Sequence, residues 1–439
     1  MAWDFETDPD VQRELDWVEE FVRDEVEPVD QVVEHAWNTR DPRRNALIRP
    51  LQERVREREL WACHLGPELG GKGYGQLRLA LLNEKLGRTH SGPVVFGCQA
   101  PDSGNAEILA HYGSDFLKKT YLDPLIEGSI VSSFSMTEPH GGSDPTGFRT
   151  TAVLDGDSWV INGEKWFSSH ALFAEFLIVL AVTEPDAPPH DRMSMFVVPA
   201  DAPGVERVRD VSVWGHEEAV GTHQYLRYTD VRVPAENLLG RRGEGFTVAQ
   251  TRLGGGRIHH AMRTVGLVQR AFELMKRRAV SRTTKGARLA DKQLVQEMIA
   301  DSWIQIEQFR LLVLRTAWKI DKHNDYRAVR ADIAAVKAAM PKVLMDVSSR
   351  AIQIHGSLGI SKELPFGKWV MESFHMGLAD GATEVHKTNL AKALLRSTTP
   401  DDGLFPPYTG PELTREALGR YAELLADADE AEPAAGGAA

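Results

Sequence analysis

Two hydrophobic periodicities occupy separate stretches of this 439-residue chain, and their separation constrains the fold more than any other feature. Residues 1–130 repeat apolar side chains at helical spacing, and residues 131–240 contain short strand-like runs separated by Pro, Asp and Gly. Residues 241–400 return to the helical period. A Rossmann fold needs alternating strands and helices, so this order argues against one. It predicts an α+β protein with a β domain between two helical ones.

Individual segments carry clear local signals. The dipeptide Asn162-Gly163, flanked by β-branched and aromatic residues, predicts a hairpin turn. Strands are expected at 176–182, 195–200 and 225–234. Residues 401–439 form a C-terminal extension whose Ala/Gly-rich end lacks side chains to bury, so we expect it to be partly disordered. Two helices are expected from apolar residues that share one face, namely Leu15, Val18, Phe21, Val22 and Val26 in the first, and Val295, Ile299, Ile306, Phe309, Val313 and Ala317 in the second.

Composition excludes several classes of protein. The net charge of −12 argues against binding to nucleic acid or an anionic membrane, although a few arginines can still form a local site for an anionic ligand. Two cysteines, Cys63 and Cys98, are too few for a disulfide framework and suit a reducing compartment. The polar N-terminus has no signal-peptide pattern, and no run approaches the ~20 apolar residues of a spanning helix. We therefore expect a cytoplasmic protein without integral membrane association.

Glycine and histidine clusters raise further hypotheses. Residues 70–75 and 254–257 match neither a P-loop nor a dinucleotide-binding fingerprint, and the first is interpreted as a surface turn. The second runs into a helical pattern, so Arg257 could lie at a helix start that holds an anion or a carboxylate. His259 and His260 are adjacent and would point about 100° apart on a helix, so no metal site is expected.

Two polar segments have both a structural and a functional interpretation. Residues 137–144 (TEPHGGSD) are either a loop with local turns or a nest of N–H and hydroxyl groups for a polar ring or a phosphate. Asp380 lies just before a helical pattern, where it or Thr383 could cap the helix. Alternatively, Asp380 is a carboxylate base that projects from the helix entry.

Five ordered motifs together resemble the acyl-CoA dehydrogenase family over roughly residues 10–398. SMTEPHGGSD is similar to the family's TEPxxGSD signature, and INGEKWFSS to its NGxKxWIT element. DVRVPAENLLGRRGEGF resembles the linker that follows the β domain, AIQIHGSLGI the Q-hydrophobic-x-GGxG element, and DGATEVH the EGT motif. GGGRIHHAMRTVGL looks closest to the branch of family members 10 and 11 and their bacterial relatives. The resemblance implies a β-barrel-like middle domain and a C-terminal four-helix bundle.

The resemblance also implies FAD as cofactor and α,β-desaturation of an acyl-CoA to trans-2-enoyl-CoA. Asp380 matches the family's catalytic carboxylate, and Arg257 the arginine that steadies it. Gly256 stands at the alternative base position used in a few members, so no second carboxylate competes there. Residues implied to bind the cofactor are Phe134, Met136, Thr137, Gly142, Ser143, Phe167 and Ser169, with Arg282, Gln353 and Gly356 reaching the cofactor of a neighbouring subunit.

The same resemblance implies partners and leaves alternatives open. Electrons would pass to an electron-transfer flavoprotein, and the enzyme would be a homodimer or homotetramer. Relatives in the same branch use 4-phosphoacyl-CoA esters, and Ala379, where many members have Tyr, would widen the thioester end of the pocket. Asp instead of Glu as base also occurs in nitroalkane oxidases, which pair it with an Arg; here Lys387 follows by seven residues. A catalytically silent acyl-CoA-binding scaffold is the alternative of another class.

Overall fold

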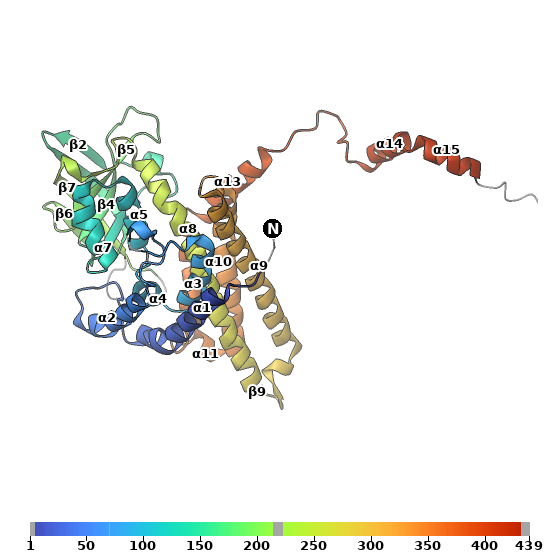
Figure 1. Cartoon of the computed structure of the whole chain (residues 1–439), viewed down its shortest axis with the longest axis horizontal. Coiled ribbons are helices and arrows are strands. Elements are labelled where there is room, and N and C mark those ends of the chain that lie inside the picture. The colour runs from blue at the N-terminus through green and yellow to red at the C-terminus, as the bar shows by residue number, and fades with distance from the viewer. Residues whose placement is uncertain (1–4, 70, 214–222, 432–439) are drawn as a thin grey trace, which may run out of the picture. The chain divides into compact units, whose positions relative to one another are not determined.

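The computed structural model describes residues 5–69, 71–213 and 223–431, which form two compact units, Met1–Leu390 and Ala391–Ala439. The first unit begins with helices (Figure 1). The predicted first helix is confirmed, because it buries Val11, Leu15, Val18 and Phe21 on one face and continues as a π-helical turn over Val22–Val26. The helices are α1 (Pro9–Phe21), α2 (Pro42–Glu57), α3 (Gly75–Leu86), α4 (Gly92–Val95), α5 (Asp102–Tyr112), α6 (Asp115–Leu117) and α7 (Asp123–Glu127).

The middle of this unit is a sheet of eight described strands in the order β6-β7-β3-β2-β4-β5-β8, with β1 parallel to β4. The strands expected at 176–182, 195–200 and 225–234 are present as β4, β5 and β7. Their buried faces explain the apolar runs, since six consecutive residues of both β4 and β5 are buried. The strands are β1 (Ser132–Ser135), β2 (Thr151–Asp155), β3 (Ser158–Ser169), β4 (Phe176–Val182), β5 (Met193–Pro199), β6 (Val205–Asp210), β7 (His223–Pro234) and β8 (Leu238–Leu239).

The expected hairpin turn at Asn162-Gly163 was wrong. The β2–β3 turn lies at Gly156 and the following residue, and β3 continues through Asn162. The Asn162 side chain makes two hydrogen bonds to Asp230 on the neighbouring strand β7. Its amide group donates to Asp230 Oδ1 at 3.0 Å, and its Oδ1 accepts from the Asp230 backbone N–H at 2.8 Å. Gly163 marks a bulge where the pairing with β7 shifts, at φ +146°. The dipeptide therefore signals a glycine-dependent bulge, not a chain reversal.

Long helices complete the first unit, and the last helix named below, α13, continues past its end at Leu390. The structure confirms the expected apolar face of α9, on which Ile306, Phe309, Val313 and Ala317 are buried. Trp303 on the same helix is 55% exposed within the single chain. The helices are α8 (Gly245–Ser281), α9 (Gln293–His323), α10 (Arg330–His355), α11 (Ser357–Ile360), α12 (Phe366–Leu378) and α13 (Thr383–Leu395), and a small hairpin of β9 (Thr283–Thr284) and β10 (Ala287–Arg288) joins α8 to α9. The predicted α+β fold is confirmed.

The glycines at 254–256 and Arg257 do not open a helix, which corrects the expected anion site. Helix α8 begins at Gly245, more than two turns earlier, so all four residues lie within it. Their N–H groups are consequently engaged in the helix and are unavailable to an anion. The glycines instead allow close approach: a Cβ on Gly255 would lie 3.2 Å from Glu107 Oε2, and one on Gly256 would lie 3.3 Å from Asp380 Oδ2.

The second unit contains α14 (Gly410–Arg420) and α15 (Ala422–Ala431), whose described side chains are exposed except for the half-buried Glu412. Residues 432–439, where an unordered tail was expected, lie outside the described residues. No described helix has the length and apolar character needed to cross a membrane.

The bulge provides a stability test. An alanine Cβ at position 163 would lie 2.6 Å from Thr150 Cα, and φ +146° is a glycine conformation. Gly163→Ala should therefore lower the free energy of unfolding by about 2–4 kcal/mol. Gly156→Ala, which has positive φ but open space around it, should cost only about 1 kcal/mol. Urea unfolding of both variants measures the difference, and equal losses would contradict the close-approach argument.

Candidate active site

A buried ion pair links the two motif segments that begin the candidate site. Glu138 Oε1 lies 2.9 Å from Lys165 Nζ, and neither side chain is exposed. Glu138 also accepts the backbone N–H groups of Arg149 and Thr150, while Lys165 donates to the Met136 carbonyl at 2.8 Å. Burial lowers the pKa of Lys165 to about 8. Burial also acts to raise the pKa of Glu138, but the positive charge of Lys165 outweighs this effect and holds the Glu138 pKa below its ordinary value. Residues 137–144 are thus fixed against β3.

The end of β3 carries a second set of contacts. The Trp166 backbone N–H donates to the Thr137 carbonyl at 2.9 Å, which keeps this segment beside the loop after β1. Phe167 has a left-handed backbone with φ +52°. Ser169 Oγ lies 2.9 Å from His223 Nδ1 on β7, and the His223 ring lies 5.6 Å from that of His375 on α12. The ledge formed by the β1 loop and the end of β3 therefore faces the C-terminal helices.

Seven of the expected cofactor residues lie on this ledge. Those from β1 and β3 are half-buried, and Gly142 and Ser143 are exposed on the following loop. A Cβ at Gly142 would have no atom within 4 Å, so a planar ring or a phosphate can approach the backbone there. The hydroxyls of Thr137 and Ser143 make no side-chain hydrogen bond within the described chain. The open aromatic and hydroxyl surface fits a flavin dinucleotide. The five half-buried residues are Phe134, Met136, Thr137, Phe167 and Ser169.

Three other expected cofactor residues lie far from the ledge. Arg282 follows α8, and Gly356 and Gln353 lie at the end of α10. Figure 1 places β9 and α11, which follow these residues, at the end of the helices away from the sheet. Arg282 is 26 residues beyond Gly256 along one helix, a distance of about 39 Å at 1.5 Å per residue. The end of α8 and the end of α10 therefore lie at the opposite end of the helices from the sheet that carries the ledge.

Asp380 is held in a strained turn between α12 and α13. Its backbone is left-handed with φ +54°, and Gly381 follows at φ +100°. The Asp380 carbonyl accepts a hydrogen bond from Arg257 Nε at 2.9 Å and lies 3.2 Å from His386 Nε2. Arg257 thus contacts the backbone of Asp380 and fixes the turn. A non-glycine residue in this conformation costs about 1–2 kcal/mol, which the surrounding contacts must offset.

The Asp380 carboxylate points toward α8 and does not cap α13. It receives no hydrogen bond from any described residue. His260 Nε2 lies 3.7 Å from Oδ2, but burial lowers the pKa of His260 to about 4, so this ring is neutral near pH 7. Only 16% of its side-chain surface is exposed. Burial favours the neutral acid, but the positive charges around the carboxylate, which near neutral pH are those of Arg252, Arg257 and Lys337, outweigh it and hold the Asp380 pKa below its ordinary value. The carboxylate is ionised at neutral pH and has an unoccupied face.

Sequence reasoning missed two cations beside this carboxylate. Arg252 lies on α8 one turn before Gly256, and its guanidinium carbon is 3.9 Å from the centre of the Phe134 ring, so it connects the ledge with Asp380. Lys337 on α10 donates to the Met376 carbonyl, and burial lowers its pKa to about 8 despite the opposing charge of Asp380. The spacing of four between Arg252 and Gly256 was the available signal, because such residues share a helix face. Lys387 is exposed.

Three models of one protein family match successive parts of this chain. The family model for the acyl-CoA dehydrogenase N-terminal domain matches residues 9–129, the middle-domain model residues 133–231, and the C-terminal-domain model residues 243–395. Together they span most of the chain. The chain belongs to the acyl-CoA dehydrogenase family. The predictions of this family, of its fold and of an FAD-dependent oxidoreductase are confirmed.

Individual acyl-CoA dehydrogenases support the assignment. "Probable acyl-CoA dehydrogenase FadE2" of Mycobacterium tuberculosis is 42% identical over 80% of this chain and 86% of that protein. Acyl-CoA dehydrogenase family member 11 of Rattus norvegicus is 40% identical over 88% of this chain, which spans only 50% of the rat protein. The solved butyryl-CoA dehydrogenase of Megasphaera elsdenii has a TM-score of 0.76 and 28% identity, and the match covers 90% of this chain and 100% of that one.

No group of three or more His, Cys, Asp or Glu side chains among the described residues could hold a metal ion. His259 and His260 indeed face different partners, since His259 Nε2 lies 3.1 Å from Gln76 Oε1 whereas His260 faces Asp380.

The buried ion pair generates a prediction. Glu138→Gln and Lys165→Met should each lower the free energy of unfolding by about 3–5 kcal/mol and weaken FAD retention, because each leaves a buried partner uncompensated. The double variant should lose less than the sum of the two. Asp155→Asn is the matched control, because it breaks an exposed pair with Arg232 and should cost less than about 1 kcal/mol. Urea unfolding and flavin fluorescence measure both effects, and a loss equal to that of the control would contradict the role.

Proposed function

We propose that this acyl-CoA dehydrogenase desaturates an acyl-CoA thioester to trans-2-enoyl-CoA, with Asp380 as the base that removes the α-proton. The carrying observation is the ionised, buried carboxylate that has no hydrogen-bond donor and faces a glycine surface at Gly256. A carboxylate in that state can accept a proton without first breaking a hydrogen bond. FAD, when bound, supplies the acceptor for the β-hydride at its N5 atom.

The neighbouring residues have distinct roles in this proposal. Arg257 holds the Asp380 carbonyl and so orients the carboxylate, which makes it a positioning residue. Arg252 and Lys337 keep the carboxylate ionised before substrate arrives. An α-proton beside a thioester is a very weak acid, so geometry and electrostatic stabilisation must supply most of the rate. Gly256 leaves room for the substrate carbon beside the carboxylate.

For the cofactor we propose the ledge described above. Its aromatic residues would cover the ring system, and its hydroxyl and backbone groups would bind polar atoms of the ring and the pyrophosphate. Support comes from the half-buried aromatic surface and from the open backbone at Gly142. The residues are Phe134, Met136, Thr137, Gly142, Ser143, Phe167 and Ser169.

We further propose a homodimer or homotetramer in the cytoplasm that passes electrons to an electron-transfer flavoprotein. Arg282, Gln353 and Gly356 would contact the cofactor of a neighbouring subunit, and their place at the end of the helices away from the sheet supports this assignment. The exposed Trp303 supports a further protein contact on α9. The proposed domains are 1–130, 131–240 and 241–400, followed by the extension 401–439.

For the substrate class we propose 4-phosphoacyl-CoA. Two observations support it, the similarity to acyl-CoA dehydrogenase family member 11 and the cations around Asp380. Arg252, Arg257 and Lys337 lie around that carboxylate, and Arg252 also faces Glu107 and Asp102. A further anion on the acyl chain would therefore find its compensation at Arg257 and Lys337.

The base is tested by Asp380→Asn. The variant should retain FAD and bind acyl-CoA, but flavin reduction should slow by at least about 10²-fold, because removal of a general base typically costs that much. Anaerobic stopped-flow absorbance measures the bleaching of the flavin. Lys387→Ala on the exposed face of α13 is the control and should bleach normally. Normal bleaching in Asp380→Asn would place the base elsewhere.

The substrate class is tested by comparing 4-phosphovaleryl-CoA with valeryl-CoA. The phosphorylated ester should reduce the flavin with at least about tenfold higher kcat/KM, since a charge-assisted contact typically contributes 1.5–3 kcal/mol. Raising the salt concentration should narrow the difference. Equal or faster turnover of valeryl-CoA would overturn the phosphorylated class while leaving the desaturation chemistry in place.

A further inference from the structure

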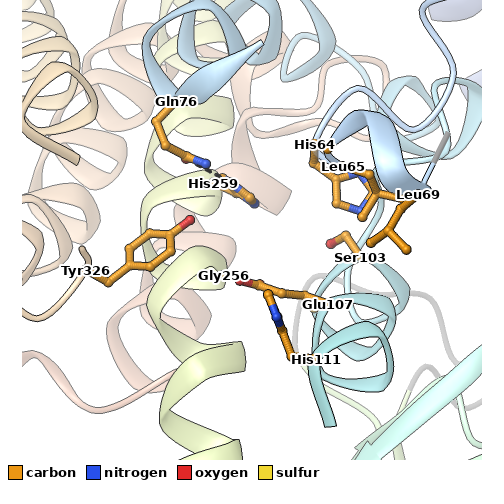
Figure 2. A pocket seen from close by; sticks show the side chains of 12 residues that line it. His64, Leu65, Leu69, Gln76, Ser103, Glu107, His111, Gly256, His259 and Tyr326 are labelled. Carbon is orange, nitrogen blue, oxygen red and sulfur yellow. Dashed lines mark hydrogen bonds between the residues drawn. The ribbon is translucent and has the colours of Figure 1, made fainter. Parts of the chain in front are cut away.

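A small cavity lies beside the catalytic turn and has a polar lining. It is formed by the turn that contains His64, by α3 at Gln76, by α5 at Ser103 and Glu107, by α8 and by Tyr326. Figure 2 shows Gln76 and Tyr326 on one side, and His64 and Ser103 on the other. Its volume of about 120 Å³ equals that of about four water molecules in the liquid. It is too small for a nucleotide but large enough for the end of a short acyl chain.

The cavity and the Asp380 carboxylate both lie against Gly256. Gly256 lines the cavity, and a Cβ on Gly256 would lie 3.3 Å from Asp380 Oδ2. A Cβ on the neighbouring Gly255 would lie 3.2 Å from Glu107 Oε2 and 3.6 Å from the Tyr326 hydroxyl. A chain whose α-carbon meets Asp380 can therefore continue into the cavity along these two glycines.

Several polar groups face the cavity without a protein partner. The Glu107 carboxyl and the Tyr326 hydroxyl make no hydrogen bond to other described residues. Both ring nitrogens of His64 are buried outside hydrogen-bond geometry, although the Ser103 backbone lies near the ring. His259 is satisfied by Gln76. Leaving a buried polar group without a hydrogen-bond partner is unfavourable, so the lining favours an occupant that forms hydrogen bonds.

The charge of the lining favours a neutral group. No lysine or arginine is among the residues that line the cavity within the described chain. Burial raises the pKa of Glu107 to about 7. Near neutral pH the protonated carboxyl can donate a hydrogen bond and the ionised carboxylate can accept one, and both forms are populated. Burial likewise lowers the pKa of His64 to about 3, which keeps the ring neutral. An anionic tail would face Glu107 without a lining cation, and an alkyl tail would leave these groups unpaired.

We propose that this cavity binds a neutral hydrogen-bonding group, such as a hydroxyl, on the distal part of the acyl chain. Glu107 and Tyr326 are the residues that select for it. The proposal rests on the proposed function, because Asp380 fixes where the chain enters. It concerns the tail of the substrate and is separate from the phosphate proposed near the cations around Asp380.

The holoenzyme is tested with 6-hydroxyhexanoyl-CoA and hexanoyl-CoA, which differ only in the terminal hydroxyl. The hydroxylated ester should reduce the flavin with at least about tenfold higher kcat/KM. Its hydroxyl can form hydrogen bonds with the polar groups of the cavity, whereas the methyl end of hexanoyl-CoA leaves those groups without a partner. Equal rates, or a preference for hexanoyl-CoA, would overturn the proposal.

Matched variants assign the effect to the cavity. Glu107→Leu should reduce the hydroxyl preference by at least about tenfold, whereas Glu107→Gln, which still forms hydrogen bonds, should stay within about threefold of the wild type. Tyr326→Phe removes only a hydroxyl and should lower the preference by about fivefold. Thermal unfolding of each variant checks folding. An unchanged preference in both Glu107→Leu and Tyr326→Phe would overturn the assignment.

Binding separates this proposal from the desaturation itself. Calorimetric titration of Asp380→Asn holoenzyme with the two esters reports the cavity without turnover, and the hydroxylated ester should bind at least about tenfold more tightly. If the esters bind with that ratio but neither bleaches the wild-type flavin, the cavity proposal holds and the proposed chemistry fails. If they bind equally or not at all, the cavity proposal fails whatever the flavin does.

Discussion

The buried ion pair between Glu138 and Lys165 is the contact on which the geometry of the cofactor ledge depends. Its two members come from the two motif segments, and their remaining polar atoms hold the Met136 carbonyl and the backbone of Arg149 and Thr150. A buried pair contributes little net stability compared with apolar residues, because desolvation offsets the attraction. Its value here is register, since it permits only one position of the loop relative to β3.

Local charge and global charge have opposite signs in this protein. The chain carries a net charge of −12, yet Arg252, Arg257 and Lys337 surround the single carboxylate of Asp380. An acidic surface weakens nonspecific association with other polyanions, whereas the interior cations act over a few ångströms in a region of lower dielectric. The overall acidity is therefore compatible with anionic cofactors and substrates, because these interior cations are shielded from the acidic surface.

Sequence periodicity and motifs predicted the α+β fold, the family and the proximity of the ledge residues, because burial patterns and short motifs are local properties. The wrong predictions depended on contacts with distant parts of the chain. Asn162-Gly163 has the composition of a turn, but this part of β3 pairs with β7 and continues as a strand. The glycines before Arg257 have the composition of a helix start, but α8 already begins at Gly245. Arg252 and Lys337 were missed, since their relation to Asp380 exists only after three helices pack together.

Gly256 has a consequence for how the position of the base can change over evolution. A side chain at this position would begin 3.3 Å from the Asp380 carboxylate, so two carboxylates at these positions would place like charges in contact. With Asp380 as the proposed base, its loss alone would remove that carboxylate before another stood at position 256. Moving the proposed base between the two helices would therefore require both substitutions together.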